Sequence, residues 1–178
     1  YNVLSMELTR PDSNIYYVYA KGMLDSTWSR VSDAINRADA QMGVVLNRQQ
    51  QYVWERGNRQ DSYQANLDEV PSVVLSGTID EDTLQQSLGD DYTVMNLTGC
   101  SLDSVLYQVS KGNPVIAKVS DTVNVVIIGY NSKNTILYYP ATQEQGYFGM
   151  QDSTSLFESA GNVFVGYMDN LGAASKSE

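Results

Sequence analysis

Hydrophobic and polar positions alternate along the chain in patterns that predict strands and helices in mixed order. Aromatic and β-branched residues at every second position favour strands, whereas apolar residues three or four positions apart favour helices. In the first part these patterns predict a strand at Ile15–Ala20, a helix within Ser26–Gly43 capped by Ser26 or Thr27, and a hairpin of short strands at Val44–Asn47 and Tyr52–Gly57.

The middle of the chain is less regular. Leu67, Val70 and Val74 fall on one helical face, but Pro71 lacks the N–H that a helix interior needs. We therefore expect a short helix broken near Pro71. The next segment, Asp80–Gly89, has a capping aspartate, acidic residues in its first turn and a glycine stop, and it predicts a second short helix.

The second half is dominated by apolar runs typical of buried strands. It predicts a helix at Ser101–Gly112, strands at Pro114–Val119, Asn124–Tyr130 and Thr135–Pro140, a further strand at Gly146–Gln151, a helix at Asp152–Gly161 capped by Asp152, and a last strand at Asn162–Met168. Residues 169–178 have little to bury and are expected to be disordered. No repeat or linker interrupts the chain, so residues 1–168 are expected to form one domain, with first and second parts at 15–59 and 97–168.

Composition and charge narrow the classes of partner. The chain has 178 residues and is 42% apolar, which is enough for a hydrophobic core. It carries 11 basic against 21 acidic residues, so its net charge of −10 disfavours nucleic acid. The sequence contains no run of about 18 apolar residues that would cross a membrane. A surface rich in Tyr, Asn, Gln and Ser but poor in Lys is typical of exported bacterial proteins, so an extracellular or cell-surface location is expected.

The cysteine and histidine counts restrict the chemistry further. Cys100 is the only cysteine, which excludes an internal disulfide and a cysteine-based metal cage. The chain has no histidine, so Cys–His and Ser–His–Asp mechanisms are excluded. Asp80–Asp82 and Asp90–Asp91 are interpreted as solvated acidic residues, because no calcium-loop spacing surrounds them. Neither a metal nor a cofactor is expected.

Three pieces of the second half carry a resemblance to a known family. The segments "KGNPVI", "VVIIGYN" and "YYP", within residues 97–168, resemble the bacteriocin-processing (double-glycine) peptidase-like family, which has a papain-like fold. The resemblance implies an α+β, papain-like protein in which a helical portion packs on a twisted antiparallel sheet.

The same resemblance implies that the catalytic residues are replaced. The family's histidine aligns with Asn124, and its orienting aspartate aligns with Tyr139. Asn cannot exchange a proton near neutral pH, and Cys100 stands too close to the "PVI" strand to be the family's nucleophile. The hypothesis is therefore a pseudo-peptidase that is not an enzyme. Asn124 and Tyr139 are expected side by side, facing one groove.

The expected function is binding of a peptide, a protein or a cell-wall ligand, or a structural role. One alternative is a cysteine peptidase-like hydrolase of unrecognised chemistry. Another is a peptidoglycan-binding module, because "YYVYAKG" and the elements after it are similar to half of the small sporulation-related repeat domains that bind cell-wall glycan. Trp54 is expected to anchor the core, with Glu55 paired to Arg56 or Arg59. The candidate ligand-binding residues are Gln51, Trp54, Arg56, Asn124 and Tyr139.

Overall fold

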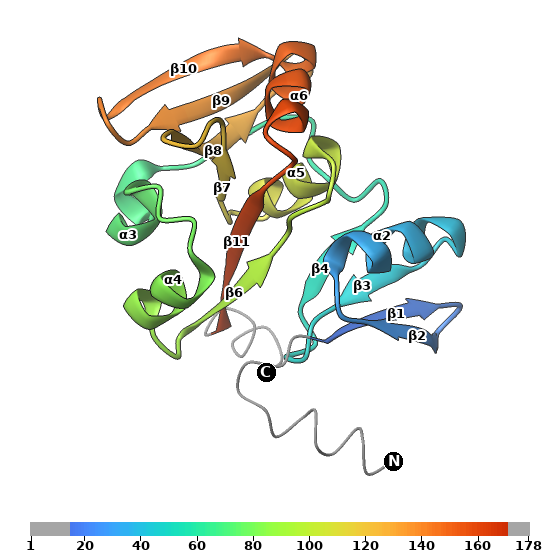
Figure 1. Ribbon diagram of the computed structural model, residues 1–178. Coiled ribbons are helices and arrows are strands. Elements are labelled where there is room, and N and C mark those ends of the chain that lie inside the picture. Colours follow the sequence, from blue (N-terminus) through green and yellow to red (C-terminus); the bar gives the residue numbers. More distant parts are fainter. Residues whose placement is uncertain (1–14, 171–178) are drawn as a thin grey trace.

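The computed structural model describes residues 15–170 and shows an α+β fold built on two antiparallel sheets (Figure 1). The predicted α+β class is confirmed. The strands are β1 (Tyr16–Ala20), β2 (Met23–Trp28), β3 (Val44–Leu46), β4 (Tyr52–Glu55), β5 (Tyr63–Gln64), β6 (Tyr92–Asn96), β7 (Val115–Lys118), β8 (Asn124–Tyr130), β9 (Asn134–Tyr139), β10 (Glu144–Gly149) and β11 (Phe164–Asp169). The helices are α2 (Val31–Ala40), η1 (Leu67–Glu69, a 3-10 turn), α3 (Ser72–Leu75), α4 (Glu81–Leu88), α5 (Leu102–Ser110) and α6 (Met150–Ser159).

The N-terminal sheet has the strand order β2-β1-β3-β4, with α2 packed against β1 and β3. The prediction that helix begins near Ser26 is wrong, because residues 23–28 form β2. Lys21 and Gly22 both have positive φ angles, of 56° and 76°. Such a two-residue turn matches the twist of a hairpin, so the chain returns alongside β1 before the helix starts.

The C-terminal sheet has the order β10-β9-β8-β7-β11-β6, and β5 adds to it by pairing with β8. The strands predicted from the apolar runs of the second half are present. Strand β6 was not predicted, because its sequence YTVMN is short and half polar. It exists through its pairing with β11, which is about 70 residues away in the sequence.

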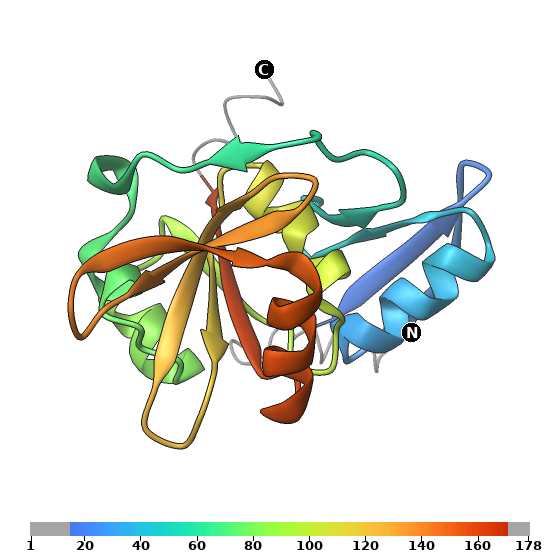
Figure 2. The ribbon, with the colours of Figure 1, turned by 90° about the horizontal axis from the view of Figure 1, so that it is seen from above.

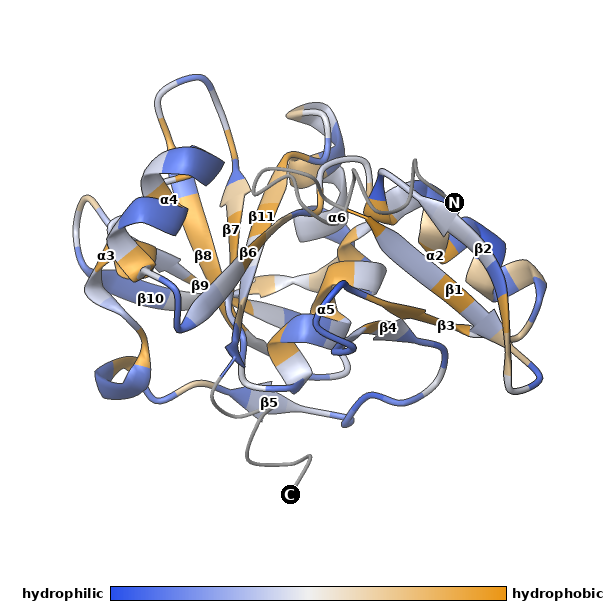
Figure 3. Ribbon diagram, turned by 90° about the horizontal axis from the view of Figure 1, so that it is seen from below, coloured by the Kyte–Doolittle hydropathy of each residue, from blue (hydrophilic) through white to orange (hydrophobic). Residues whose placement is uncertain are grey.

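The two faces of the C-terminal sheet are covered by different helices. Helices α5 and α6 pack on one face, where Val125, Ile127 and Leu137 lie, and this core continues into the N-terminal sheet. Helices α3 and α4 cover the other face, over Val126 and Ile128. Figure 1 shows α5 between the two sheets, where it contacts both β4 and β8. Figure 3 shows the apolar residues concentrated along β7, β8 and β11.

Helix boundaries follow the predicted capping residue in two of four cases, since neither Ser26 nor Thr27 caps α2, which begins after Arg30. Asp80 accepts a hydrogen bond from the Thr83 N–H, and Ser101 accepts one from the Ser104 N–H, as predicted for α4 and α5. Helix α6 differs: it begins at Met150 after Gly149, which makes no side-chain cap, and Asp152 lies inside its first turn.

The ends of the chain bear on two further predictions. Asp169 is the last residue of β11, so residue 169 does not belong to a disordered tail; residues 171–178 lie outside the described part. Within residues 15–170, no helix has both the length and the apolar character needed to cross a membrane.

Candidate functional site

A large concavity, which we call the central groove, lies between the N-terminal and C-terminal halves and has a volume of about 1040 Å³. In Figure 2 the segment between β4 and β5 curves past α5, and Arg59 of this segment donates a hydrogen bond to the carbonyl oxygen of Asp103 in α5. The lining of the groove comes from α2 (Ile35, Asn36, Asp39), residues 54–57 and 59–62, α5 (Asp103, Ser104, Tyr107), the β8–β9 turn (Asn131, Ser132) and α6 (Met150, Thr154).

The central groove combines aromatic walls with charged groups of both signs. Trp54 and Tyr107 line the groove but are both buried, so each exposes little surface to it. Arg56 pairs with Asp39 at 3.5 Å. Arg59 pairs with Asp103 at 3.1 Å, and its guanidinium lies 5.0 Å from the centre of the Tyr130 ring.

Four carboxylates and two guanidinium groups line the groove, so the lining has more negative than positive charges. The carboxylates belong to Asp39, Glu55, Asp61 and Asp103. Burial, together with the nearby Glu55 carboxylate and Tyr52, raises the pKa of Tyr107 to about 12. A ligand that brings positive charge would offset this excess of negative charge.

A second concavity, which we call the neutral pocket, has a volume of about 670 Å³ and lies beside α3 at one end of the C-terminal sheet. Its lining is Ser72, Leu75, Ser76, Gly77, Thr122, Val123, Asn124, Tyr138, Tyr139, Pro140, Ala141 and Gln143. None of these residues carries a charged side chain.

Asn124 and Tyr139 both line this pocket, but their side chains point to opposite faces of the sheet. Asn124 shares the face of Val126, which stands opposite Tyr138 in the β8–β9 register. Tyr139 is displaced by one residue, so it packs toward the α5 and α6 side, where its ring lies 5.8 Å from that of Phe148. The expectation that Tyr139 lies beside Asn124 on one face is wrong, and Tyr138 has that place.

Asn124 forms part of the floor of the neutral pocket. Its Nδ2 donates a hydrogen bond of 3.0 Å to the carbonyl oxygen of Gly77. Gly77 has a φ of +77°, and a Cβ there would lie 2.9 Å from Cγ of Pro140. The backbone at the end of α3 therefore approaches β8 and the end of β9 closely because residue 77 has no side chain.

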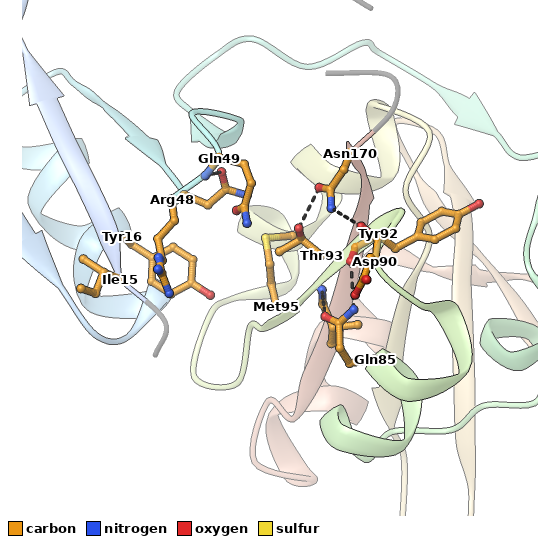
Figure 4. Close-up of a pocket in the computed structure, with 12 residues that line it drawn as sticks. Ile15, Tyr16, Arg48, Gln49, Gln85, Asp90, Tyr92, Thr93, Met95 and Asn170 are labelled. Carbon is orange, nitrogen blue, oxygen red and sulfur yellow. Dashed lines mark hydrogen bonds between the residues drawn. The ribbon is translucent and has the colours of Figure 1, made fainter. Parts of the chain in front are cut away.

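A third, smaller concavity of about 220 Å³ lies between the β3–β4 turn and β6 (Figure 4). Gln85 reaches from α4 and bonds the outer edge of β6: its amide donates to the carbonyl oxygen of Tyr92 and accepts from the N–H of Val94. Asn170 accepts from the Thr93 hydroxyl and donates to the carbonyl oxygen of Asp90. These bonds tie α4, β6 and the residue after β11 together, so we assign Gln85, Thr93 and Asn170 a structural role.

The remaining candidates are distributed over the molecule. Gln51 is buried, accepts a hydrogen bond from Asn47 and donates one to the carbonyl oxygen of Asp169, so it ties the β3–β4 turn to β11. Trp54 belongs to the core, as expected, and also touches the central groove with Arg56. Glu55 accepts from Asn58, rather than pairing with Arg56 or Arg59. The five candidates thus do not form one site.

Cys100 lies in the core just before α5 and lines none of the three concavities. Burial raises the pKa of its thiol to about 12, and the neighbouring Arg30 only partly opposes this shift. The thiol is therefore protonated at neutral pH. In residues 15–170, no group of three or more acidic or cysteine side chains is arranged to hold a metal ion.

Sequence reasoning missed Tyr107, Tyr138 and Gln143 as site residues. Tyr107 lies in helix α5, and the apolar pattern of that helix predicts burial in the core without indicating that Tyr107 borders a groove. Gln143 follows Pro140 in a turn, and turns that follow strand ends are common places for binding residues.

Comparisons with known proteins give one distant likeness. No protein-family model matches the chain, and no curated protein matches it. Among solved structures, the chain is similar to a "putative C39-like peptidase" from Bacillus anthracis, with 18% sequence identity and a TM-score of 0.37. The likeness covers 43% of this chain and 51% of that chain, about half of its length.

The prediction that the protein is not an enzyme is corrected by this comparison. The similar solved chain is described as a peptidase, and nothing in the described residues shows that catalytic residues have been lost.

Proposed function

We propose that the protein is a papain-like domain of an exported bacterial protein that binds an extended, basic peptide in the central groove. The observation that carries the proposal is the groove itself. At about 1040 Å³ it reaches the upper end of the range usual for ligand sites, and both halves of the fold contribute to its walls.

The lining of the groove matches the chemistry of a peptide. Ile35, Trp54 and Met150 offer apolar contacts, which usually anchor the centre of an interface. Exposed polar groups such as Asn36 and Ser132 stand at its margin, as in the polar rim of protein interfaces.

The charge of the groove selects the kind of peptide. Two of its four carboxylates are paired with Arg56 and Arg59, and Glu55 and Asp61 are not paired with a basic side chain within residues 15–170. The net charge of −10 for the whole chain adds a long-range attraction for cations. Basic peptides should therefore bind faster and more tightly than acidic ones of equal length.

The test is fluorescence anisotropy with labelled ten-residue peptide pools that are basic, neutral or acidic. Asn36→Trp places a large ring on an exposed helical position of the groove wall. Gln86→Trp does the same at an exposed position of α4 that lines none of the three concavities described above. We expect the basic pool to bind most tightly, Asn36→Trp to weaken binding about tenfold or more, and Gln86→Trp to leave it unchanged.

Equal binding by wild type and Asn36→Trp would contradict the proposal, as would the absence of binding by all three pools. Mass spectrometry of the recovered peptides detects any cleavage in the same samples. Cleavage of the peptides that bind would extend the proposal to a hydrolase.

A further inference from the structure

We infer that the neutral pocket is a second binding site, separate from the central groove, and that it takes an uncharged saccharide. The inference rests on what lines the pocket and on which of its polar atoms have no partner.

The pocket differs from the rest of the molecule in its charge. Charged residues make up 18% of the chain, yet all 12 lining residues are uncharged. A pocket without charges gives no electrostatic advantage to an ionic ligand, which would lose its hydration on entry without gaining a counter-charge. The ligand that fits this lining is neutral.

The hydrogen-bonding groups of the pocket are largely unused by the protein. Within the described part of the chain, the side-chain polar atoms of Ser72, Thr122, Tyr138 and Gln143 form no hydrogen bond, and none of these atoms is fully buried without a partner. Asn124 uses its Nδ2 on Gly77, while its Oδ1 accepts no bond from residues 15–170. The pocket thus keeps hydroxyl and amide groups that solvent or a ligand can reach.

The apolar part of the lining suits a sugar ring. Val123, Tyr138 and Pro140 supply carbon surface beside the hydroxyl and amide groups. A saccharide has the matching character, because its ring carries apolar C–H faces and a rim of hydroxyl groups. The close approach of Gly77 to Pro140 and the hydrogen bond from Asn124 to Gly77 hold this side of the pocket in place.

The test is isothermal titration calorimetry with two neutral probes, chitotetraose and cellotetraose, and one anionic probe, tetragalacturonate. Ala141→Arg introduces bulk and charge at an exposed lining position, and Ala40→Arg makes the same change at an exposed position at the end of α2. Gln143→Ala removes one exposed amide without adding bulk.

We expect at least one neutral probe to bind with a sub-millimolar Kd and tetragalacturonate to bind at least about tenfold more weakly. Ala141→Arg should raise the Kd about tenfold or more, Gln143→Ala should raise it about threefold or more, and Ala40→Arg should leave it unchanged. Asn36→Trp in the central groove should also leave it unchanged.

Three outcomes would overturn the inference: no heat from either neutral probe up to about 10 mM, equal affinity for tetragalacturonate, or a Kd that Ala141→Arg does not change. The peptide experiment on the central groove stands or falls independently of these results, because its variant lies outside the neutral pocket.

Discussion

Single residues decide the shape of the neutral pocket, and Gly77 is the clearest case. It is buried at the end of α3 with a left-handed backbone, and Pro140 occupies the space where a Cβ would stand. Gly22 has nearly the same φ, +76°, but a Cβ there would meet nothing within 4 Å. A comparison of the same substitution at Gly22 and Gly77 therefore separates the cost of the left-handed backbone from the cost of the steric clash.

We predict that Gly22→Ala lowers the free energy of unfolding by about 1 kcal/mol, from the left-handed backbone alone. Gly77→Ala should lose about 1–3 kcal/mol more, because the added methyl group overpacks the contact with Pro140. Urea denaturation of both variants measures the difference. Equal losses would mean that the end of α3 moves away from β9 at little cost.

Cys100 gives a second prediction at this scale, in its response to pH. Burial raises its pKa from the usual value near 9 to about 12, so the folded chain holds the thiol proton to higher pH than the unfolded chain does. Stability from this group is complete below pH 9 and is lost as pH rises from about 9 to about 12.

The free energy of unfolding should therefore fall as pH rises above 9. Tyr107 should add to this fall above pH 10, because burial also raises its pKa, from the usual value near 10 to about 12. Cys100→Ala should flatten the curve between pH 9 and 10 by as much as about 1.4 kcal/mol per pH unit. A thiol reagent should label native Cys100 slowly at pH 7 and rapidly in urea; rapid labelling of the native protein would place the thiol at the surface.

At the scale of elements, the structure shows which strands a sequence pattern can reveal. Strands β7, β8 and β9 are buried apolar runs, and their own residues predict them. Strands β2 and β6 contain polar residues at half of their positions, and they exist because β1 and β11 offer them an edge. No local pattern contains that information.

The expected pairing of Asn124 with Tyr139 on one face of the sheet was wrong for a related reason. The sequence drew attention to the start of β8 and the end of β9, and in the structure Asn124 and Tyr139 line one pocket. It did not indicate whether Tyr138 or Tyr139 shares the face of Asn124, because a shift of one residue in strand pairing reverses every side chain.

Besides its pairing with β11, strand β6 is bonded to α4 through the side chain of Gln85. Gln85 bonds the carbonyl oxygens of Gly89 and Tyr92 and the N–H of Val94. Gln85→Ala should lower the free energy of unfolding by about 1–3 kcal/mol, because partly buried backbone groups lose their partners. Hydrogen exchange of the Val94 amide should accelerate as well.

The matched control is Gln86→Ala, one residue further along α4 and exposed. It should change neither stability nor exchange at Val94. Equal stability and equal Val94 exchange in the two variants would mean that water replaces the hydrogen bonds of Gln85 without loss of stability.

At the scale of the whole molecule, one apolar core runs from the N-terminal sheet through α5 to the C-terminal sheet. Gln108 reinforces the junction: it is buried in α5, and its amide donates to the carbonyl oxygens of Tyr52 and Val53 in β4. We therefore predict one cooperative unfolding transition, as expected for a single domain.

Both tryptophans, Trp28 and Trp54, belong to the N-terminal half, so their fluorescence reports that half, whereas far-UV circular dichroism reports all of the secondary structure. The two urea curves should coincide. Gln108→Ala should shift both to lower urea by the same amount. A fluorescence midpoint well below the dichroism midpoint would divide the chain into two units.

The separation of a charged groove from an uncharged pocket has a consequence for the medium in which the protein works. Salt screens interactions between exposed charges over a Debye length of about 8 Å at physiological ionic strength and about 3 Å at 1 M. Any ligand of the central groove would lose affinity steadily as salt rises, because its attraction acts through carboxylates such as Asp61. A ligand of the neutral pocket would be held equally well in dilute and concentrated salt. One molecule would thus carry a contact that responds to the ionic strength of its surroundings and another that does not.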